Sequence, residues 1–88
     1  MSDTGRTNDF YKVWHAAVKK RDKGKCVWPD CKRRGREVHH IIPYSAAPHL
    51  RYTVANGCCL CITHHKYIKG RENDFVGMFM AILEKYKK

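Results

Sequence analysis

Residues 56–66, with the sequence NGCCLCITHHK, place three cysteines and two histidines within eleven positions. Cysteine sulfur and histidine nitrogen are the side-chain atoms that zinc and related transition metals prefer. A second group lies upstream, where Cys26 and Cys31 are separated by four residues that include a Pro-Asp turn signal. Metal binding is therefore the first chemistry that this sequence indicates.

Two pairs of these residues have the spacing of a structural zinc site. Cys26 and Cys31 form one pair, and Cys61 and His64, separated by two residues, form the other. Structural zinc takes four nitrogen or sulfur ligands in a tetrahedron, and two close pairs can supply them. We therefore expect one zinc ion bound by Cys26, Cys31, Cys61 and His64.

This assignment leaves Cys58 and Cys59 outside the zinc site. Neighbouring residues on a strand point to opposite faces, so at most one of the two can face the same metal as Cys61. Cys59 shares a face with Cys61 and is a rival to His64 for the fourth position. We expect both cysteines to be small apolar residues of a hairpin core.

Three further histidines have a spacing that suggests a second metal. His39 and His40 are adjacent in a short segment rich in β-branched residues, and His65 lies at the start of a predicted helix. Adjacent histidines alone are usually core or surface residues. A hairpin followed by a helix, however, can bring one strand histidine and the helix histidine to one ion, and leave the other strand histidine free to act on water.

The elements that must position these residues can be predicted from periodicity and turn signals. We expect strands over 37–43 and 56–60, joined by an irregular loop over 44–55, and a helix from Cys61 to about Lys69 that Gly70 ends. A second helix is expected over 73–86, with Asn73 or Asp74 as its cap and apolar residues at Phe75, Phe79, Ile82 and Leu83.

The N-terminal part is predicted to be a flexible tail over 1–8 followed by an amphipathic helix. Asn8 or Asp9 would cap this helix, and Gly24 would end it. Trp14 and Tyr11 are expected in the core. The predicted buried stripe is Phe10, Val13, Trp14, Ala17 and Val18.

Composition favours a single small domain with a polyanionic partner. Eighty-eight residues bury too little surface for an ample core, so a metal staple is expected. The net charge is +10, and nine bases fall between Lys19 and Arg36. So much charge of one sign favours nucleic acid, although a solubilising surface would look the same.

Cysteine usage and hydropathy indicate a compartment. The five cysteines are odd in number and alternate with histidines, which argues against full disulfide pairing. The start, MSDTGRTNDF, is polar and shows no secretory signal, and no apolar run approaches the roughly 20 residues of a membrane span. We expect a reducing cytoplasm and no membrane partner.

The pattern EVHHIIP…N…LCxxHH, from Glu37 to His65, resembles the HNH nucleases, a branch of the ββα-metal (His-Me finger) group. Asn56 follows His40 by sixteen residues, and His65 follows Asn56 by nine. The flanking CVWPDC and LCITH resemble the zinc-stapled members common in bacteriophages. The resemblance covers residues 26–70. It implies an α+β, zinc-stabilised ββα-metal core flanked by N- and C-terminal helices, within a single nuclease domain over 1–88.

The resemblance also implies roles for individual residues. His40 would be the general base, and His39, where many members carry aspartate, would bind the catalytic divalent ion together with His65. Asn56 would fix the hairpin loop and orient His40, or bind the ion as in some relatives. Histidine-rich relatives such as the colicin nucleases have a further histidine where this chain has Lys69. Two imidazoles make Mn²⁺, Co²⁺ or Ni²⁺ suitable besides Mg²⁺.

The expected activity is DNA cleavage by a one-metal mechanism with 5′-phosphate products, through nicking or weakly specific cutting. If the protein is phage-encoded, it would act in the cytoplasm of the bacterial host. The rival is a non-catalytic zinc module that only binds DNA, such as an accessory of a phage packaging terminase. A third interpretation, an RNA-binding module, lacks exposed aromatic platforms. The residues expected to contact DNA are Lys32, Arg33, Arg34, Arg36, Arg51, Lys66, Lys69 and Arg71.

Overall fold

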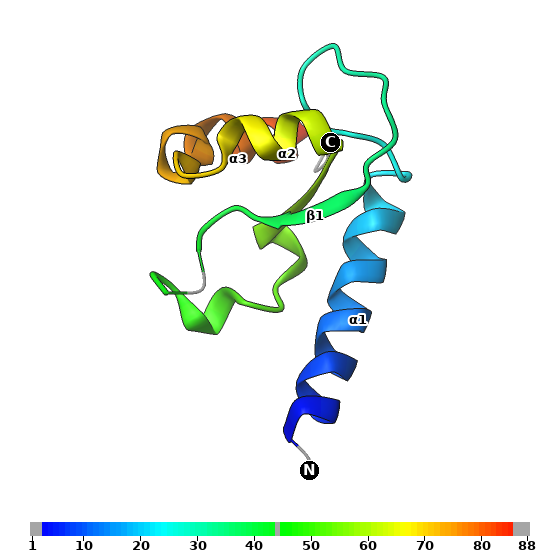
Figure 1. The fold of residues 1–88 in the computed structure, drawn as a ribbon, viewed down its shortest axis with the longest axis vertical. Helices are drawn as coiled ribbons and strands as arrows, with labels where there is room; N and C mark the ends of the chain where they lie inside the picture. The colour runs from blue at the N-terminus through cyan, green and yellow to red at the C-terminus, as the bar shows by residue number, and fades with distance from the viewer. Residues whose placement is uncertain (1–2, 44, 86–88) are drawn as a thin grey trace.

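The computed structural model describes residues 3–43 and 45–85, and the side chains from residue 9 onward. In this part of the chain it is a small α+β fold with a two-stranded antiparallel hairpin and three α-helices (Figure 1). The elements, in order, are α1 (Asp3–Arg21), β1 (Glu37–His40), β2 (Gly57–Leu60), α2 (Ile62–Ile68) and α3 (Val76–Glu84).

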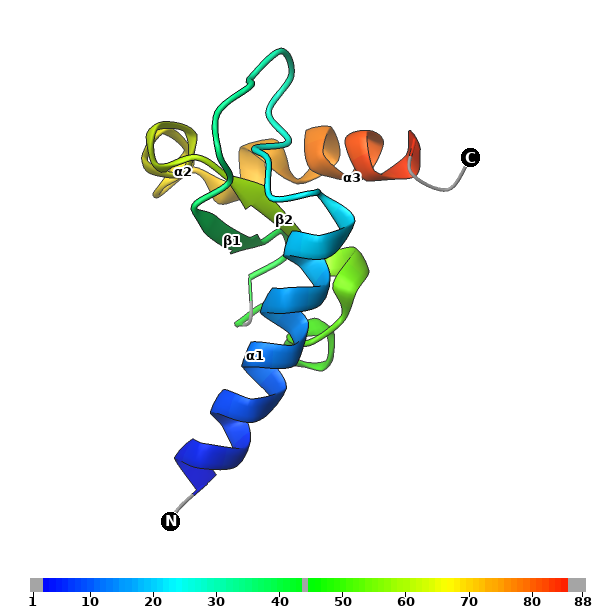
Figure 2. The same cartoon turned by 90° about the vertical axis from the view of Figure 1, so that its right-hand side faces the viewer.

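The hairpin separates the helices into two groups. Figures 1 and 2 show α2 and α3 on one side of the strands and α1 on the other, with the N-terminal turns of α1 projecting away from the body. The register pairs His39 with Cys58 and His40 with Gly57. Neighbouring residues of a strand point to opposite faces. His39 and Cys58 therefore lie on one side of the hairpin, and His40 and Cys59 lie on the other.

Each side of the hairpin has its own hydrophobic core. The larger core lies under α2 and α3, where Cys58 and Leu60 of β2 pack with Phe79 and Ile68. The smaller core lies under α1 and consists of Trp14, Val18 and Cys59, with Val38 and Tyr52 packed against it. A strand covered on both faces accounts for the fully apolar character of GCCL.

Among the described side chains, the buried residues of α1 all lie in its C-terminal half, so the predicted stripe is wrong in part. Trp14 and Val18 are buried, whereas Phe10 is 61% exposed and Val13 is 71% exposed. Tyr11, expected in the core, is 40% exposed. The helical period is present, but the first turns extend past the hairpin, where Phe10 only stacks on the Tyr52 ring with centroids 5.9 Å apart.

The ends of α1 also differ from the prediction. The helix begins at Asp3, upstream of the expected caps, so the predicted tail is helical over residues 3–8, while residues 1 and 2 lie outside the described chain. It ends at Arg21, and Lys23 and Gly24 then have positive φ angles of 58° and 70°. The Gly24 amide donates to the Lys19 carbonyl oxygen at 2.9 Å, which closes the helix as Gly24 was predicted to do.

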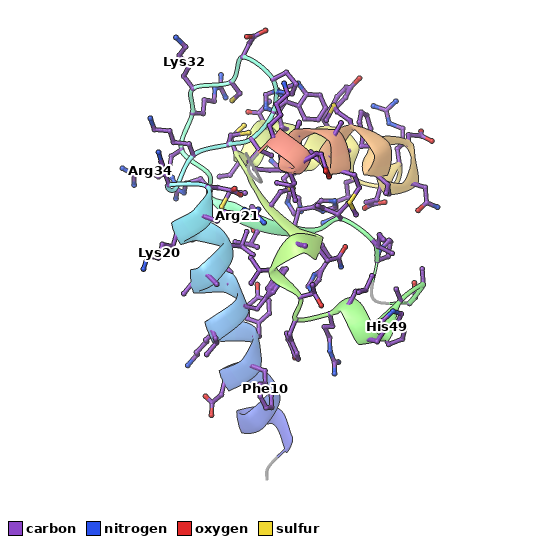
Figure 3. All side chains as sticks on the ribbon, turned by 180° about the vertical axis from the view of Figure 1, so that it is seen from behind. Phe10, Lys20, Arg21, Lys32, Arg34 and His49 are labelled. Carbon is purple, nitrogen blue, oxygen red and sulfur yellow. The ribbon has the colours of Figure 1, made fainter. Side chains whose placement is uncertain are left out.

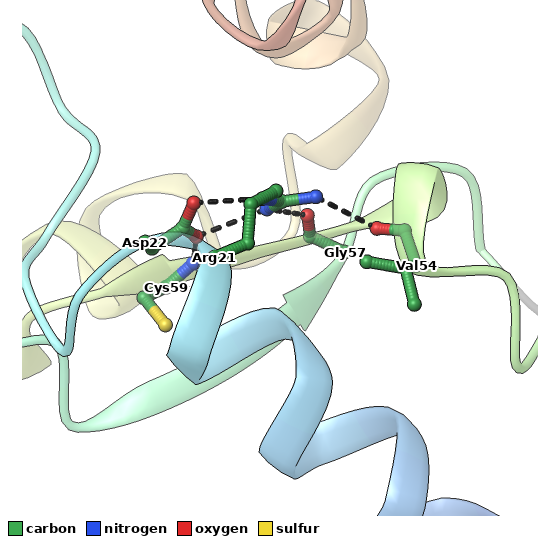
Figure 4. Close-up of polar contacts among 5 residues, drawn as sticks. All are labelled: Arg21, Asp22, Val54, Gly57 and Cys59. Atoms are coloured by element: carbon green, nitrogen blue, oxygen red, sulfur yellow. Dashed lines mark hydrogen bonds and ion pairs between the residues drawn. The ribbon is translucent and has the colours of Figure 1, made fainter. Parts of the chain in front are cut away.

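A buried ion pair joins the end of α1 to β2 (Figure 4). Arg21 binds the carboxylate of Asp22 at 2.9 Å and donates to the carbonyl oxygens of Val54 and Gly57 at 2.8 and 2.6 Å. Asp22 accepts a hydrogen bond from the Cys59 amide at 2.9 Å. One of the bases counted toward the charged surface, Arg21, is therefore not equivalent to the rest, because it stabilises the fold.

The remaining elements follow the prediction with shorter bounds. β1 ends at His40 rather than at Pro43, and the loop over 44–55 contains the 3-10 turns Pro48–Leu50 and Val54–Asn56. The expected helix over 73–86 starts instead as a 3-10 turn, Glu72–Phe75, with no side-chain cap from Asn73 or Asp74, and α3 ends at Glu84. Among the described residues no helix is both long and apolar enough to cross a membrane.

Candidate metal centre and histidine pocket

The four predicted zinc ligands lie together. The ligand atoms of Cys26, Cys31, Cys61 and His64 are all within 4.8 Å of one another, the one such group of three or more in the described chain. His64 Nδ1 is 3.3 Å from Cys61 Sγ and 3.6 Å from Cys26 Sγ. This cluster could bind a structural metal ion, as the spacing predicted.

Local backbone geometry positions these ligands. A turn, in which the Cys31 amide donates to the Trp28 carbonyl oxygen at 2.9 Å, brings the first pair together. Cys61 is the N-cap of α2, and its sulfur accepts a hydrogen bond from the His64 amide at 3.4 Å. The Trp28 ring stacks on the His64 imidazole, with centroids 4.4 Å apart and an interplanar angle of 5°. This stack fixes the ring of the only nitrogen ligand in the cluster.

The rival ligand Cys59 does not reach the cluster. It is fully buried in the core under α1, on the other face of the hairpin from the metal ligands. Burial raises the pKa of its thiol to about 11, so it stays protonated and is a poor metal ligand at neutral pH. Cys58 is also fully buried, in the core under α2 and α3. Both cysteines are apolar core residues, as predicted.

The three predicted site histidines line an open pocket of about 500 Å³ beside β1. His39 and His65 face one another there, with ring centroids 5.9 Å apart. His40, on the same strand as His39, also lines the pocket. The structure therefore brings all three predicted site histidines to one hollow, whose full lining is Val38, His39, His40, Pro43, Ser45, His65 and Glu72.

His39 is a buried ring with an unused nitrogen. The residue is 7% exposed and packs against Phe79, with ring centroids 5.5 Å apart. Within the described chain its Nε2 atom is buried and has no hydrogen-bond partner. Burial, together with the nearby His65, lowers the pKa of His39 to about 4. The imidazole is therefore neutral at pH 7, the form that binds metal ions.

The His40 ring lies on the other side of β1 from the His39 ring, against α1. Its ring stacks on the Trp14 indole, with centroids 4.1 Å apart and an interplanar angle of 9°. Its Nε2 atom is 2.9 Å from the carbonyl oxygen of Arg51. A carbonyl oxygen only accepts, so Nε2 carries the proton, and Nδ1 has the lone pair in the neutral ring. This tautomer leaves Nδ1 able to take a proton from water.

Asn56 is committed to the loop that follows β1. It is 2% exposed, and its Oδ1 accepts a hydrogen bond from the Ile42 amide at 2.8 Å. Its Nδ2 donates to the carbonyl oxygens of Ile42 and Leu50 at 3.1 and 3.3 Å. The geometry matches the loop-fixing role among the two that were expected, and does not place Asn56 in the lining of the pocket.

The basic residues predicted to contact DNA have unequal surroundings. Figure 3 shows Lys20, Lys32 and Arg34 projecting from one side of the molecule. Arg51 is half-buried and packs over the Tyr52 ring at 4.9 Å, which makes it a part of the loop as well as a charge.

Two further groups complete the predicted basic surface. Arg33, Arg34 and Arg36 line a hollow of about 210 Å³ at the start of α2, where Arg33 donates to the Thr63 hydroxyl at 2.8 Å. Lys66, Lys69 and Arg71 are exposed around the end of α2. Arg71 packs over the Tyr67 ring at 4.6 Å.

Comparisons with protein-family models, curated proteins and solved structures found no match. A functional assignment therefore has to come from the residues and their geometry. Two features of the pocket were not predicted: the Trp14 stack on His40, since Trp14 was expected only as a core residue, and the carboxylate of Glu72. Neither has a spacing signal that links it to the histidines.

Proposed function

We propose that this protein is a metal-dependent endonuclease of the HNH type that hydrolyses DNA phosphodiester bonds. The observation that carries the proposal is the pocket beside β1. It combines a buried nitrogen on His39 that has no partner among the described residues, a facing imidazole on His65, and His40 in a tautomer suited to a base. Core or surface histidines would not need to converge in this way.

We propose zinc as the ion of the Cys/His cluster. Three sulfur atoms and one nitrogen are a donor set that zinc prefers in structural sites. The cluster joins the 26–31 turn to the start of α2. In a domain of 88 residues, such a link is expected to contribute folding free energy.

In the proposed reaction, His40 Nδ1 accepts a proton from the attacking water. The Arg51 carbonyl oxygen and the Trp14 ring hold the imidazole in place, and the hydrogen bond to Arg51 fixes the tautomer that leaves Nδ1 unprotonated. His39 and His65 would hold the divalent ion, and Asn56 would keep the loop in register. When bound, the ion would supply charge stabilisation at the phosphate and the leaving oxygen.

The basic surface supports a DNA substrate. Exposed arginines and lysines lie at the end of α1 and in the 25–36 segment, where Figure 3 shows Lys20, Lys32 and Arg34 on one side, and others lie around the end of α2. Contacts of this kind bind the phosphate backbone without reading sequence, so weakly specific cutting or nicking is expected.

A non-catalytic zinc module that only binds DNA is the second candidate. One observation favours it: within the described residues, the side chains of the histidine pocket do not form a group of three potential ligands within 4.8 Å. Such a module would bind DNA with the same basic surface and would have no activity with any ion.

Plasmid nicking across a series of Mg²⁺, Mn²⁺, Co²⁺ and Ni²⁺ separates the two candidates. The wild type should nick with at least one ion, and His40→Ala should be slower by ~10²–10⁴-fold with unchanged DNA binding in gel shifts. His49→Ala is the matched control, because His49 is exposed and does not line the pocket. A wild type that never nicks supports the binding module, and a fully active His40→Ala removes the assigned base.

A further inference from the structure

We infer that Glu72 is the third protein ligand of the divalent ion held at His39 and His65. This inference rests on the proposed function and extends it, because two imidazoles alone leave the ion weakly held by protein. No regularity in the sequence points to Glu72, which lies seven residues after His65 and in a different element.

The turn after α2 brings Glu72 to the pocket. Gly70 has a φ angle of 85°, a left-handed conformation that suits glycine, and the Arg71 amide donates to the Ile68 carbonyl oxygen at 2.8 Å. The chain therefore reverses at the end of α2, and Glu72 begins the following 3-10 turn on the pocket side. Electrostatic interactions connect its carboxylate with both His39 and His65.

The pocket contains an independent sign of a missing ligand. His39 is more than nine-tenths buried, lines the pocket, and has no partner for Nε2 in the described chain. A buried polar atom without a partner is destabilising, and a bound cation would satisfy it. Two imidazoles and one carboxylate are a common donor set for divalent transition metals.

Glu72 is also the member of the set that can move. Its carboxylate accepts hydrogen bonds only from backbone amides of its own turn, that of Gly70 at 3.2 Å and that of Glu72 itself, among the described residues, and the residue is only half-buried. His39 is packed and His65 is on a helix, so an ion would draw the glutamate toward them. One turn after His65, just past the end of α2, the chain has Lys69, which is exposed and cationic and so is no alternative ligand.

The carboxylate should matter more for some ions than for others. Oxygen ligands suit Mg²⁺ and Mn²⁺, whereas imidazoles alone suit Ni²⁺ and Co²⁺. Glu72→Gln should therefore weaken Mn²⁺ binding by at least about tenfold and weaken Ni²⁺ binding less. If only the negative charge of Glu72 mattered, Glu72→Gln would weaken the binding of both ions equally.

The test is titration of zinc-loaded protein with Mn²⁺ and Ni²⁺, followed by calorimetry and, for Mn²⁺, by electron paramagnetic resonance. The matched control is Asp74→Asn, which removes one negative charge from the same turn at an exposed residue outside the pocket. The inference holds if only Glu72→Gln loses Mn²⁺ affinity. It is overturned if Glu72→Gln and Asp74→Asn bind Mn²⁺ alike.

His39→Ala distinguishes this inference from the proposed function. If the wild type binds Mn²⁺, His39→Ala loses it and Glu72→Gln does not, the pocket is a metal site and Glu72 is not a ligand. If the wild type takes up no ion that depends on His39, the inference and the proposed catalytic site fail together.

Discussion

Trp14 provides the sharpest test of how the fold orients the proposed base. Its indole is 1% exposed, stacks on His40 and donates from Nε1 to the Thr53 carbonyl oxygen at 2.8 Å. One side chain of α1 therefore holds both the imidazole and the loop after Arg51. Trp14→Leu removes the stack and the hydrogen bond, whereas Trp14→Phe removes the hydrogen bond and keeps an aromatic ring.

The magnitudes follow from these contacts. A buried tryptophan cut to alanine costs about 3–5 kcal/mol, and leucine retains part of that packing. The stack contributes about 0.5–1.5 kcal/mol and the hydrogen bond about 1 kcal/mol. We therefore expect a loss of roughly 2–4 kcal/mol in the free energy of unfolding for Trp14→Leu and roughly 1–2 kcal/mol for Trp14→Phe.

The assay combines urea unfolding of the zinc-loaded proteins with nicking rates at a temperature where each variant is folded. Trp14→Leu should nick at least about tenfold more slowly than Trp14→Phe, because His40 loses the surface that fixes its ring. Val18→Ala is the control, since it perturbs the same core and leaves the stack intact. If Trp14→Leu nicks as fast as Val18→Ala, the stack does not position the base.

Three further predictions concern metal, pH and salt. Cys26→Ala should lose the cluster metal and unfold by circular dichroism, because it removes one of four ligands, whereas Cys58→Ala should retain about one equivalent of zinc in metal analysis. The folded pKa of His39 lies near 4, below its ordinary value of 6.5, so protonation favours the unfolded chain. Protein without a second ion should therefore keep its full stability above about pH 6.5 and lose on the order of 3 kcal/mol as the pH falls to about 4, a loss that urea titrations of His39→Asn should not show. DNA affinity in gel shifts should fall steeply between ~50 and ~200 mM salt, and a flat response would contradict backbone contacts by the arginines.

The metal-binding cluster could be predicted from the sequence because its geometry is mostly local. Each pair spans only a few residues, and a turn or a helix start brings the two members together whatever surrounds them. The order of strand, strand and helix likewise predicted that one strand histidine would approach His65 and leave the other free. His39 and His65 do face one another, while His40 lines the same pocket with its ring stacked on Trp14. The two-residue period of a strand is enough for that prediction.

The extent of α1 could not be predicted in the same way. Periodicity identified Trp14 and Val18, but it also selected Phe10 and Val13, which are exposed. A helical period shows which residues share a face, whereas burial depends on how far the rest of the molecule extends along that face. The hairpin covers only the C-terminal half of the helix (Figure 2).

Only the tertiary structure decided the surroundings of the pocket. Trp14 donates a hydrogen bond to Thr53, 39 residues later in the chain. Arg21 and Asp22 form hydrogen bonds with β2 residues that are 36 and 37 residues later. Glu72 reaches the histidines because a left-handed glycine reverses the chain after α2. Contacts of this kind depend on how separate elements pack, and side-chain spacing within one segment carries no information about them.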